Sequence, residues 1–267
     1  MANATSATPT DAADHSRTPT LVRIPLDRPW VWLAKGFSDL RRAPVVSLGY
    51  GIVFAIAGYL LIGSLWALGW LYLTLPLAAG FMIVGPLFAV GLYEVSRRLQ
   101  VGEAVSFGTA LAAWKRNGSQ IGLMGVALLL FMFAWLRLAA LIFMLFFGLE
   151  PPPLDQLVQQ TLLSPEALPF LIIGGLVGAV LALVSFAISV ISIPLLLDRP
   201  EVNVFTAITT SIQAVKTNPM PMLFWGALIV LFVGAGLATF LLGLIITLPL
   251  IGHASWHAYQ DLTGAET

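Results

Sequence analysis

The chain has 267 residues, of which 58% are hydrophobic and only 10% are charged, and its mean hydropathy is +0.92. A soluble domain of this length could not bury so much apolar surface, so the composition indicates a protein whose solvent is the lipid bilayer. The 13 basic and 13 acidic side chains cancel, which leaves no overall field to attract a nucleic acid. The absence of cysteine excludes disulfides, Cys-ligated zinc and iron–sulfur clusters.

The N-terminal residues differ from the rest of the chain. Residues 1–26 are rich in Ala, Thr, Ser, Asp and Pro and contain no apolar run typical of a signal peptide. We expect them to form a disordered tail, because such a composition buries too little apolar surface to fold. The membrane domain is expected over residues 27–262, followed by a short C-terminal tail of residues 263–267.

Six apolar segments are long enough to cross a bilayer as helices, since a hydrocarbon core of about 30 Å takes about 20 helical residues. The expected spans are residues 44–66, 71–96, 119–147, 168–197, 219–238 and 239–260. No polar loop separates the last two, so we place a tight turn near residues 236–239. The fold class predicted is therefore an all-α integral membrane protein with six transmembrane helices.

The basic residues predict how these spans are oriented. Twelve of the 13 Lys and Arg residues lie in the N-terminal segment or in the connections 97–118 and 198–218, which share one side if six spans alternate. By the positive-inside rule this side is cytoplasmic, and both ends of the chain lie there. The connection 148–168 contains acidic residues but no cation, as expected of the opposite side.

A threefold internal repeat supports this topology. The segments that precede the odd-numbered spans align as Arg41-Arg42-Ala43-Pro44, Lys115-Arg116-Asn117-Gly118 and Lys216-Thr217-Asn218-Pro219. Seven residues after each segment a glycine follows, at Gly51, Gly125 and Gly226. The even-numbered spans share an Ile-x-x-Pro-Leu pattern, and we expect each of its prolines to kink its helix, at Pro86, Pro194 and Pro249.

Each copy also begins with a predicted amphipathic helix. Before the first span, Leu33, Phe37 and Leu40 follow helical i, i+4, i+7 spacing. We expect these helices to lie flat on the cytoplasmic interface, with Lys35, Asp39 and Arg42 on the polar side of the first one. The three copies cover about residues 27–99, 103–200 and 202–262. Because each copy crosses twice, all have one orientation, which predicts a pseudo-symmetry axis along the membrane normal.

Two of these segments, GPLFAVGLYEVSRR at residues 85–98 and GHASWHAY at residues 252–259, resemble a bacterial family of predicted inner-membrane proteins. This family is the domain of unknown function twenty-one eighty-nine, and the resemblance covers most of residues 30–262. It implies a place in the bacterial cytoplasmic (inner) membrane and no established activity. Some members carry the label of a cytochrome c oxidase subunit, but three histidines are too few to ligate two haems and a copper.

Four polar residues near the cytoplasmic ends of the even-numbered spans are the main candidates for chemistry. Asp198 and His253 lie four residues after their prolines, and Glu94 and His257 lie eight after theirs. If the copies surround one axis, Asp198 meets His253 and Glu94 faces His257. This cluster could bind a divalent metal or relay protons. The alternatives are a buried polar latch and, for Glu94, a local ion pair with the arginines that follow it.

A haem is a further alternative at the two histidines, although residues one turn apart cannot take opposite faces of one haem, so a second subunit would have to supply a ligand. We predict no cofactor as the leading interpretation. Arg137 is the only cation inside an apolar segment. It follows Arg116 by a rise of about 31 Å along a helix, which places it at the outer interface. There it can snorkel, or contact an anion or a lipid headgroup.

These features favour a non-enzymatic inner-membrane scaffold or accessory protein that binds lipids, partner membrane proteins or a second copy of itself. The chain contains no nucleotide-binding, metalloprotease or serine-hydrolase motif. The spans also lack the polar stripe of a pore for hydrophilic solutes. One alternative is a transporter or carrier of a hydrophobic or amphipathic small molecule. The other is a metal- or haem-binding membrane protein.

Overall fold

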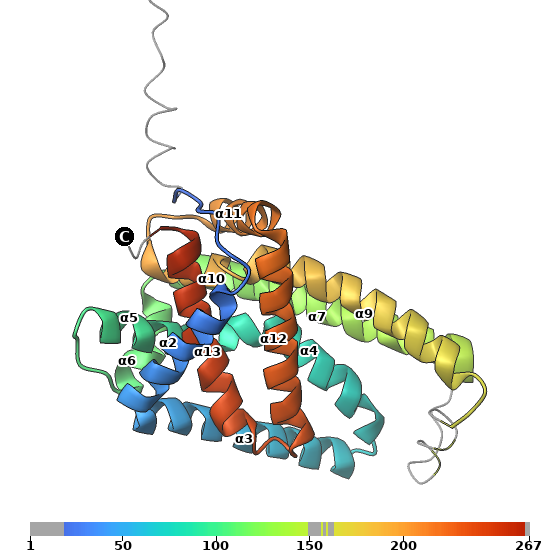
Figure 1. Cartoon of the computed structure of the whole chain (residues 1–267). Coiled ribbons are helices and arrows are strands. Elements are labelled where there is room, and N and C mark those ends of the chain that lie inside the picture. Colours follow the sequence, from blue (N-terminus) through green and yellow to red (C-terminus); the bar gives the residue numbers. More distant parts are fainter. Residues whose placement is uncertain (1–18, 149–155, 157–158, 160–162, 265–267) are drawn as a thin grey trace, which may run out of the picture.

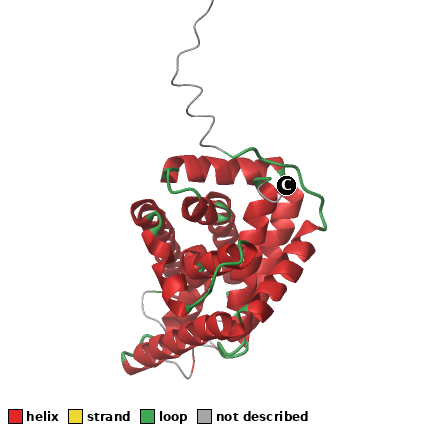
Figure 2. Ribbon diagram, turned by 90° about the vertical axis from the view of Figure 1, so that its left-hand side faces the viewer, coloured by secondary structure: helices red, strands yellow, loops and turns green. Residues whose placement is uncertain are grey.

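The structure is a computed structural model that describes residues 19–148, 156, 159 and 163–264. These residues form helices joined by loops, with no strand among them (Figure 2). The helices of the first half are α2 (Arg28–Arg42), α3 (Pro44–Ala67), η1 (Leu71–Leu73), α4 (Thr74–Phe88), α5 (Val90–Gln100), α6 (Phe107–Ala112), η2 (Ala113–Lys115) and α7 (Gly118–Phe147). Those of the second half are α9 (Ala167–Ser189), α10 (Ser192–Asp198), α11 (Val204–Thr217), α12 (Pro219–Ala238) and α13 (Leu244–Leu262).

Five helical stretches among the described residues are long and apolar enough to cross a membrane. They are Pro44–Ala67, Leu71–Gln100, Gly118–Phe147, Ala167–Asp198 and Pro219–Ala238. These five agree with the first five predicted spans. The sixth predicted segment begins with a turn and continues as α13, which is helical but carries His253, His257, Gln260 and Asp261 in its second half. Those side chains lower its hydropathy, so α13 is not among the five.

The central helix of the fold is α13, which packs against α2, α3, α5, α10 and α12. Every residue from Ile251 to Leu262 is buried. Two glycines allow the close approach of its neighbours. A Cβ at Gly36 of α2 would lie 2.7 Å from the backbone nitrogen of Ala254, and one at Gly51 of α3 would lie 2.6 Å from the Cα of Ile245. Neither position has room for a side chain, because backbone atoms cannot give way.

We expect Gly51→Ala to destabilise the protein, because the added methyl group would push α3 away from the backbone of α13. Overpacking of this kind costs about 1–3 kcal/mol. Gly63→Ala in the same helix is a matched control, since nothing lies within 4 Å of its added Cβ. Unfolding in detergent, followed by tryptophan fluorescence, measures both. Equal stabilities for the two variants would contradict the close packing of α3 on α13.

The three segments aligned in the sequence as repeat junctions share one backbone conformation. Ala43, Asn117 and Asn218 precede α3, α7 and α12, with φ/ψ of −129°/56°, −149°/55° and −129°/55°. The preceding basic residues of two junctions bond to the ends of even-numbered spans. Arg42 donates to the carbonyl of Leu99 and Arg116 to that of Leu197, each at 3.0 Å. The chain thus makes the same turn where each odd-numbered span begins.

The glycine that follows each junction lies against a helix of another predicted copy. Gly51 of the first copy meets Ile245 of the third, Gly125 of the second meets Leu87 of the first at 3.1 Å, and Gly226 of the third meets Phe186 of the second at 3.7 Å. These distances refer to the position of an added Cβ, and the last is ordinary van der Waals contact. The three contacts follow one cyclic order through the copies.

The three prolines have different local structures. The chain leaves the helix at Ala89, three residues after Pro86, before α5 begins. It turns at Val190 and Ile191, before Pro194, which then lies in the first turn of α10, where a missing N–H costs nothing. Pro249 lies inside α13, which has no break. The helix is therefore interrupted at a different position relative to Pro86 and Pro194, and it continues through Pro249.

One expectation about the amphipathic helices is wrong. Asp39 of α2 is 3% exposed, so it does not lie on a polar outer side. It points toward α13, where His257 is its partner. Leu33 and Leu40 are buried as expected, whereas Phe37 is half exposed and stacks with Arg41. Asp39 can be buried because the surface of α13 that α2 contacts is itself partly polar.

The α7–α9 hairpin extends away from the other helices, on the right of Figure 1. Only 6% of the most apolar stretch of each of its two spans is buried, compared with 39% for Leu71–Gln100. The indole of Trp135 fixes its inner part, donating to the carbonyl of Pro76 at 2.8 Å and lying against Gly178. Few residues of the hairpin are therefore buried within the protein.

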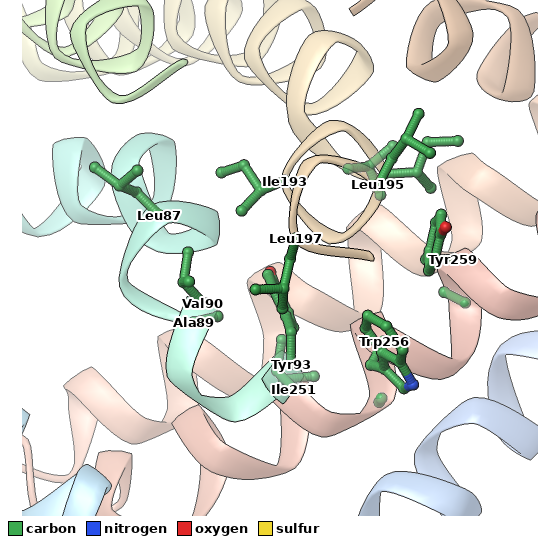
Figure 3. Close-up of a cluster of buried hydrophobic side chains, with 14 of the residues drawn as sticks. Leu87, Ala89, Val90, Tyr93, Ile193, Leu195, Leu197, Ile251, Trp256 and Tyr259 are labelled. Atoms are coloured by element: carbon green, nitrogen blue, oxygen red, sulfur yellow. The ribbon is translucent and has the colours of Figure 1, made fainter. Parts of the chain in front are cut away.

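At the opposite end, apolar side chains of three even-numbered spans meet in one core (Figure 3). Val90 and Tyr93 come from α5, Leu197 from α10, and Trp256 and Tyr259 from α13, and each is at most 2% exposed. The end of the fold that carries the basic connections is therefore closely packed.

Candidate functional site: the buried polar residues of α13

His253 lies where α3, α5 and α13 meet, and its side chain has no exposed surface. Its Nε2 is 2.9 Å from the Ser47 hydroxyl and its Nδ1 is 2.8 Å from the Ser96 hydroxyl. Because a hydroxyl can donate or accept, either neutral tautomer of the ring satisfies both bonds. The imidazole thus joins three helices, and both of its nitrogens are occupied.

His257 lies one turn further along and is 5% exposed. Its Nε2 is 2.8 Å from Oδ2 of Asp39 in α2, and its Nδ1 is 3.4 Å from the Gln100 amide nitrogen. That amide nitrogen can only donate, so Nδ1 of His257 accepts its hydrogen bond. The ring proton is then on Nε2, which donates a hydrogen bond to Asp39. Gln100 also accepts from the Trp256 indole at 2.8 Å. His257 is therefore fixed from two sides.

Polar side chains in the last turns of α13 also bond to other helices. Tyr259 donates its hydroxyl proton to Asp198 of α10 at 2.7 Å. Asp261 accepts from the Trp32 indole at 2.6 Å and from both Nε and Nη2 of Arg28, the latter at 2.9 Å. Trp32 is fully buried. Polar side chains of α13 thus bond to α2, α3, α5 and α10.

Glu94 has local partners. Its carboxylate accepts from Nε and Nη2 of Arg97 at 2.8 and 2.9 Å and from Nε of Arg98 at 2.8 Å. The Glu94 side chain is only 3% exposed, and Glu103 contacts both arginines from the other side. Both oxygens of Glu94 are therefore held by ion pairs at the end of α5.

The four residues predicted to form one cluster have separate partners. Asp198 bonds to Tyr259 and not to a nitrogen of His253, because serines occupy both of these. Among the described residues, no group of three or more His, Cys, Asp or Glu side chains is placed to hold a metal ion. The arrangement can link helices and orient imidazoles.

Several partners escaped prediction from the sequence. Ser47, Ser96 and Gln100 are short or neutral polar residues in predicted spans or at their ends, and nothing in their spacing relates them to a histidine more than 150 residues away. The available signal was their polarity, since Ser47 is one of few hydroxyl residues in the first span. A buried hydroxyl usually has a bonding partner.

Arg137 lies on the outward face of α7. Phe133 and Leu141, one turn before and after it, are 57% and 60% exposed. Within the part of the chain that the structure describes, no ion pair or hydrogen bond involves its guanidinium. The side chain therefore points away from the protein among apolar neighbours.

Comparison with known proteins adds one match. Residues 73–198 match the family model described as a predicted integral membrane protein (DUF2189). This stretch runs from α4 to α10 and is shorter than the resemblance expected from the sequence. No curated protein and no solved structure matches the chain significantly. With its apolar helices, the chain is an integral membrane protein that is similar, over residues 73–198, to the DUF2189 family.

Proposed function

We propose that this chain is a non-enzymatic membrane scaffold or accessory protein, in which a packed end built around α13 carries the α7–α9 hairpin as a surface for a partner membrane protein. The observation that carries the proposal is the exposure of this hairpin, of which only 6% of each apolar stretch is buried. Side chains apolar on every face of a helix must be covered by lipid or by another protein.

The packed end supports a structural role for α13. Its histidines bond to serines and an aspartate of other helices, and its aromatic residues fill the core in Figure 3. A carrier for a hydrophobic molecule would have to separate α5, α10 and α13 in each cycle. The bonds that link these helices oppose such a movement. We therefore favour the scaffold over the carrier, and over a metal- or haem-binding protein.

We also propose α13 as a sixth span and a ring of three repeat copies around one axis. The common backbone turn before α3, α7 and α12 supports the repeat. The cyclic contacts of Gly51, Gly125 and Gly226 support closure of the ring. With six spans, both ends of the chain lie in the cytoplasm, and the resemblance points to the inner membrane.

The orientation can be tested with single cysteines, because the chain has none of its own. Glu166, Lys115 and Lys216 are all exposed. In right-side-out vesicles we expect Glu166→Cys to react with a membrane-impermeant maleimide. Lys115→Cys and Lys216→Cys should react only after the vesicles are opened. Labelling of all three in intact vesicles would contradict the six-span topology.

The partner surface can be tested by photo-crosslinking in native membranes. Leu176 of α9 and Leu231 of α12 are both 63% exposed, so a photoreactive residue at Leu231 is a matched control for one at Leu176. We expect a discrete protein adduct from Leu176 and only lipid adducts from Leu231. Lipid adducts from both positions, with one small molecule bound to the purified protein, would overturn the scaffold and favour the carrier.

A further inference from the structure

The segment before α2 crosses the packed end of the fold as an extended chain between the ends of α11 and α13 (Figure 1). The N–H of Val22 donates to the carbonyl of Leu262 at 3.0 Å. Residues 19–26 were expected to belong to a disordered tail, but Val22 and Ile24 bond to Asn218, which precedes α12, and Val22 also bonds to the end of α13. Their contacts raise the question of what the surface beneath them recognises.

The side-chain amide of Asn218 bonds to the main chain of this segment in the way that the backbone of a neighbouring β-strand would. Its Oδ1 accepts the N–H of Ile24 at 2.9 Å, and its Nδ2 donates to the carbonyl of Val22 at 3.0 Å. The side chain is 3% exposed and also donates to Ala214. Paired donor and acceptor bonds to one stretch of main chain select an extended peptide, irrespective of its side chains, as in strand addition.

Apolar contacts add side-chain selectivity. Leu21 and Ile24, three positions apart, pack against the hydrophobic core, whereas Val22 between them is 41% exposed. An extended peptide with apolar residues at these two positions therefore fits the surface. A polar residue at either position would lose its water without gaining a partner.

The equivalent junction of the second copy shows why this contact is unusual. Asn117 donates to the carbonyls of Leu196 and Val202, which belong to the chain leading directly into the next copy. Asn218 bonds instead to a segment far away in the chain, since its partners lie 194 and 196 residues away. The third junction thus receives a segment from the start of the chain.

We propose that Asn218, together with the Leu262 carbonyl, forms a binding site for an extended peptide with apolar side chains three positions apart. Residues 21–24 of the same chain occupy it and clasp the first copy to the third. The site does not depend on the scaffold role, since a carrier with the same fold would contain it.

The clasp can be trapped in the full-length protein, again because no native cysteine interferes. A Cβ at Gly264 would lie 3.2 Å from the Val22 side chain. We expect Val22→Cys with Gly264→Cys to form a disulfide on mild oxidation, seen as a gel shift that reductant reverses. Val22→Cys with the exposed Lys115→Cys is the control pair and should not link. Failure of the first pair to link, or equal linking of both, would overturn the clasp.

Peptide binding is tested with a chain that begins at Leu26 behind an initiator methionine. We expect its unfolding temperature to fall by about 5 °C, since several buried groups lose their partners. A synthetic peptide of residues 18–27 should restore it, and a scrambled peptide should not. Asn218→Ala in the shortened chain should abolish the restoration. If the peptide leaves the unfolding temperature unchanged, the site does not bind a free peptide. If the shortened chain does not fold, the two cysteine pairs alone test the clasp.

Discussion

Replacing His253 by alanine is expected to destabilise the protein more than any other single change to α13. The variant loses bonds to Ser47 and Ser96, which have no exposed surface of their own. Each hydroxyl left unpaired costs about 1–3 kcal/mol, and the cavity left by the ring adds to this. We expect a total of about 3–5 kcal/mol, reduced where a serine rotates to bond a carbonyl of its own helix.

The measurement is unfolding in mixed micelles with increasing SDS, followed by tryptophan fluorescence. Ser64→Ala in α3 is a control, because this exposed serine bonds only to its own helix, at Leu60. A triple variant with His253→Leu, Ser47→Ala and Ser96→Ala removes all three polar partners together. It should recover much of the loss, since replacing both sides of a bond by apolar groups costs little. If His253→Ala matches Ser64→Ala, the imidazole does not link these helices.

The sequence was sufficient for the elements governed by local pattern. Hydropathy and segment length predicted the five apolar spans, and the aligned junctions mark where α3, α7 and α12 begin. These features depend on residues close together in the chain. The second half of α13 was harder, because its hydropathy is that of a surface helix while its surroundings bury it. Only the three-dimensional packing distinguishes these two situations.

The partners of the candidate site could not be predicted, for two physical reasons. The first is distance along the chain, since Asp39 and His257 are 218 residues apart. The second is rotation. Residues that lie the same number of positions after Pro86, Pro194 and Pro249 face one another only if the backbone follows the same path after each proline. The chain leaves the helix after Pro86, turns before Pro194 and continues without a break at Pro249. Glu94 and Asp198 therefore face other partners than the histidines.

The partners that the structure does provide explain how α2 is held against α13. Gly36 brings its backbone against that of α13, and Asp39 and Trp32 then reach His257 and Asp261. Two polar contacts and one backbone contact fix α2 along the second half of α13. A helix that lay at the membrane interface without contacts to α13 would leave those three residues exposed to headgroups and water.

The Asp39–His257 pair should therefore be the second largest contributor among these contacts. Asp39→Ala leaves the buried Nε2 proton of His257 without its acceptor at 2.8 Å, and a buried donor left unpaired costs about 1–3 kcal/mol. Asp39→Asn keeps the shape and an acceptor oxygen, so we expect a loss of about half that size. The same SDS titration measures both.

A double-mutant cycle separates the pair from its surroundings. If the two side chains interact directly, Asp39→Ala combined with His257→Leu should cost less than the sum of the single changes, by about 1–3 kcal/mol. Additive losses would show that each residue acts through other neighbours. Arg42 is the neighbour to control, since its Nη1 lies 3.9 Å from Asp39. Arg42→Gln should leave the coupling intact, because that guanidinium is half exposed and its charge is screened by water.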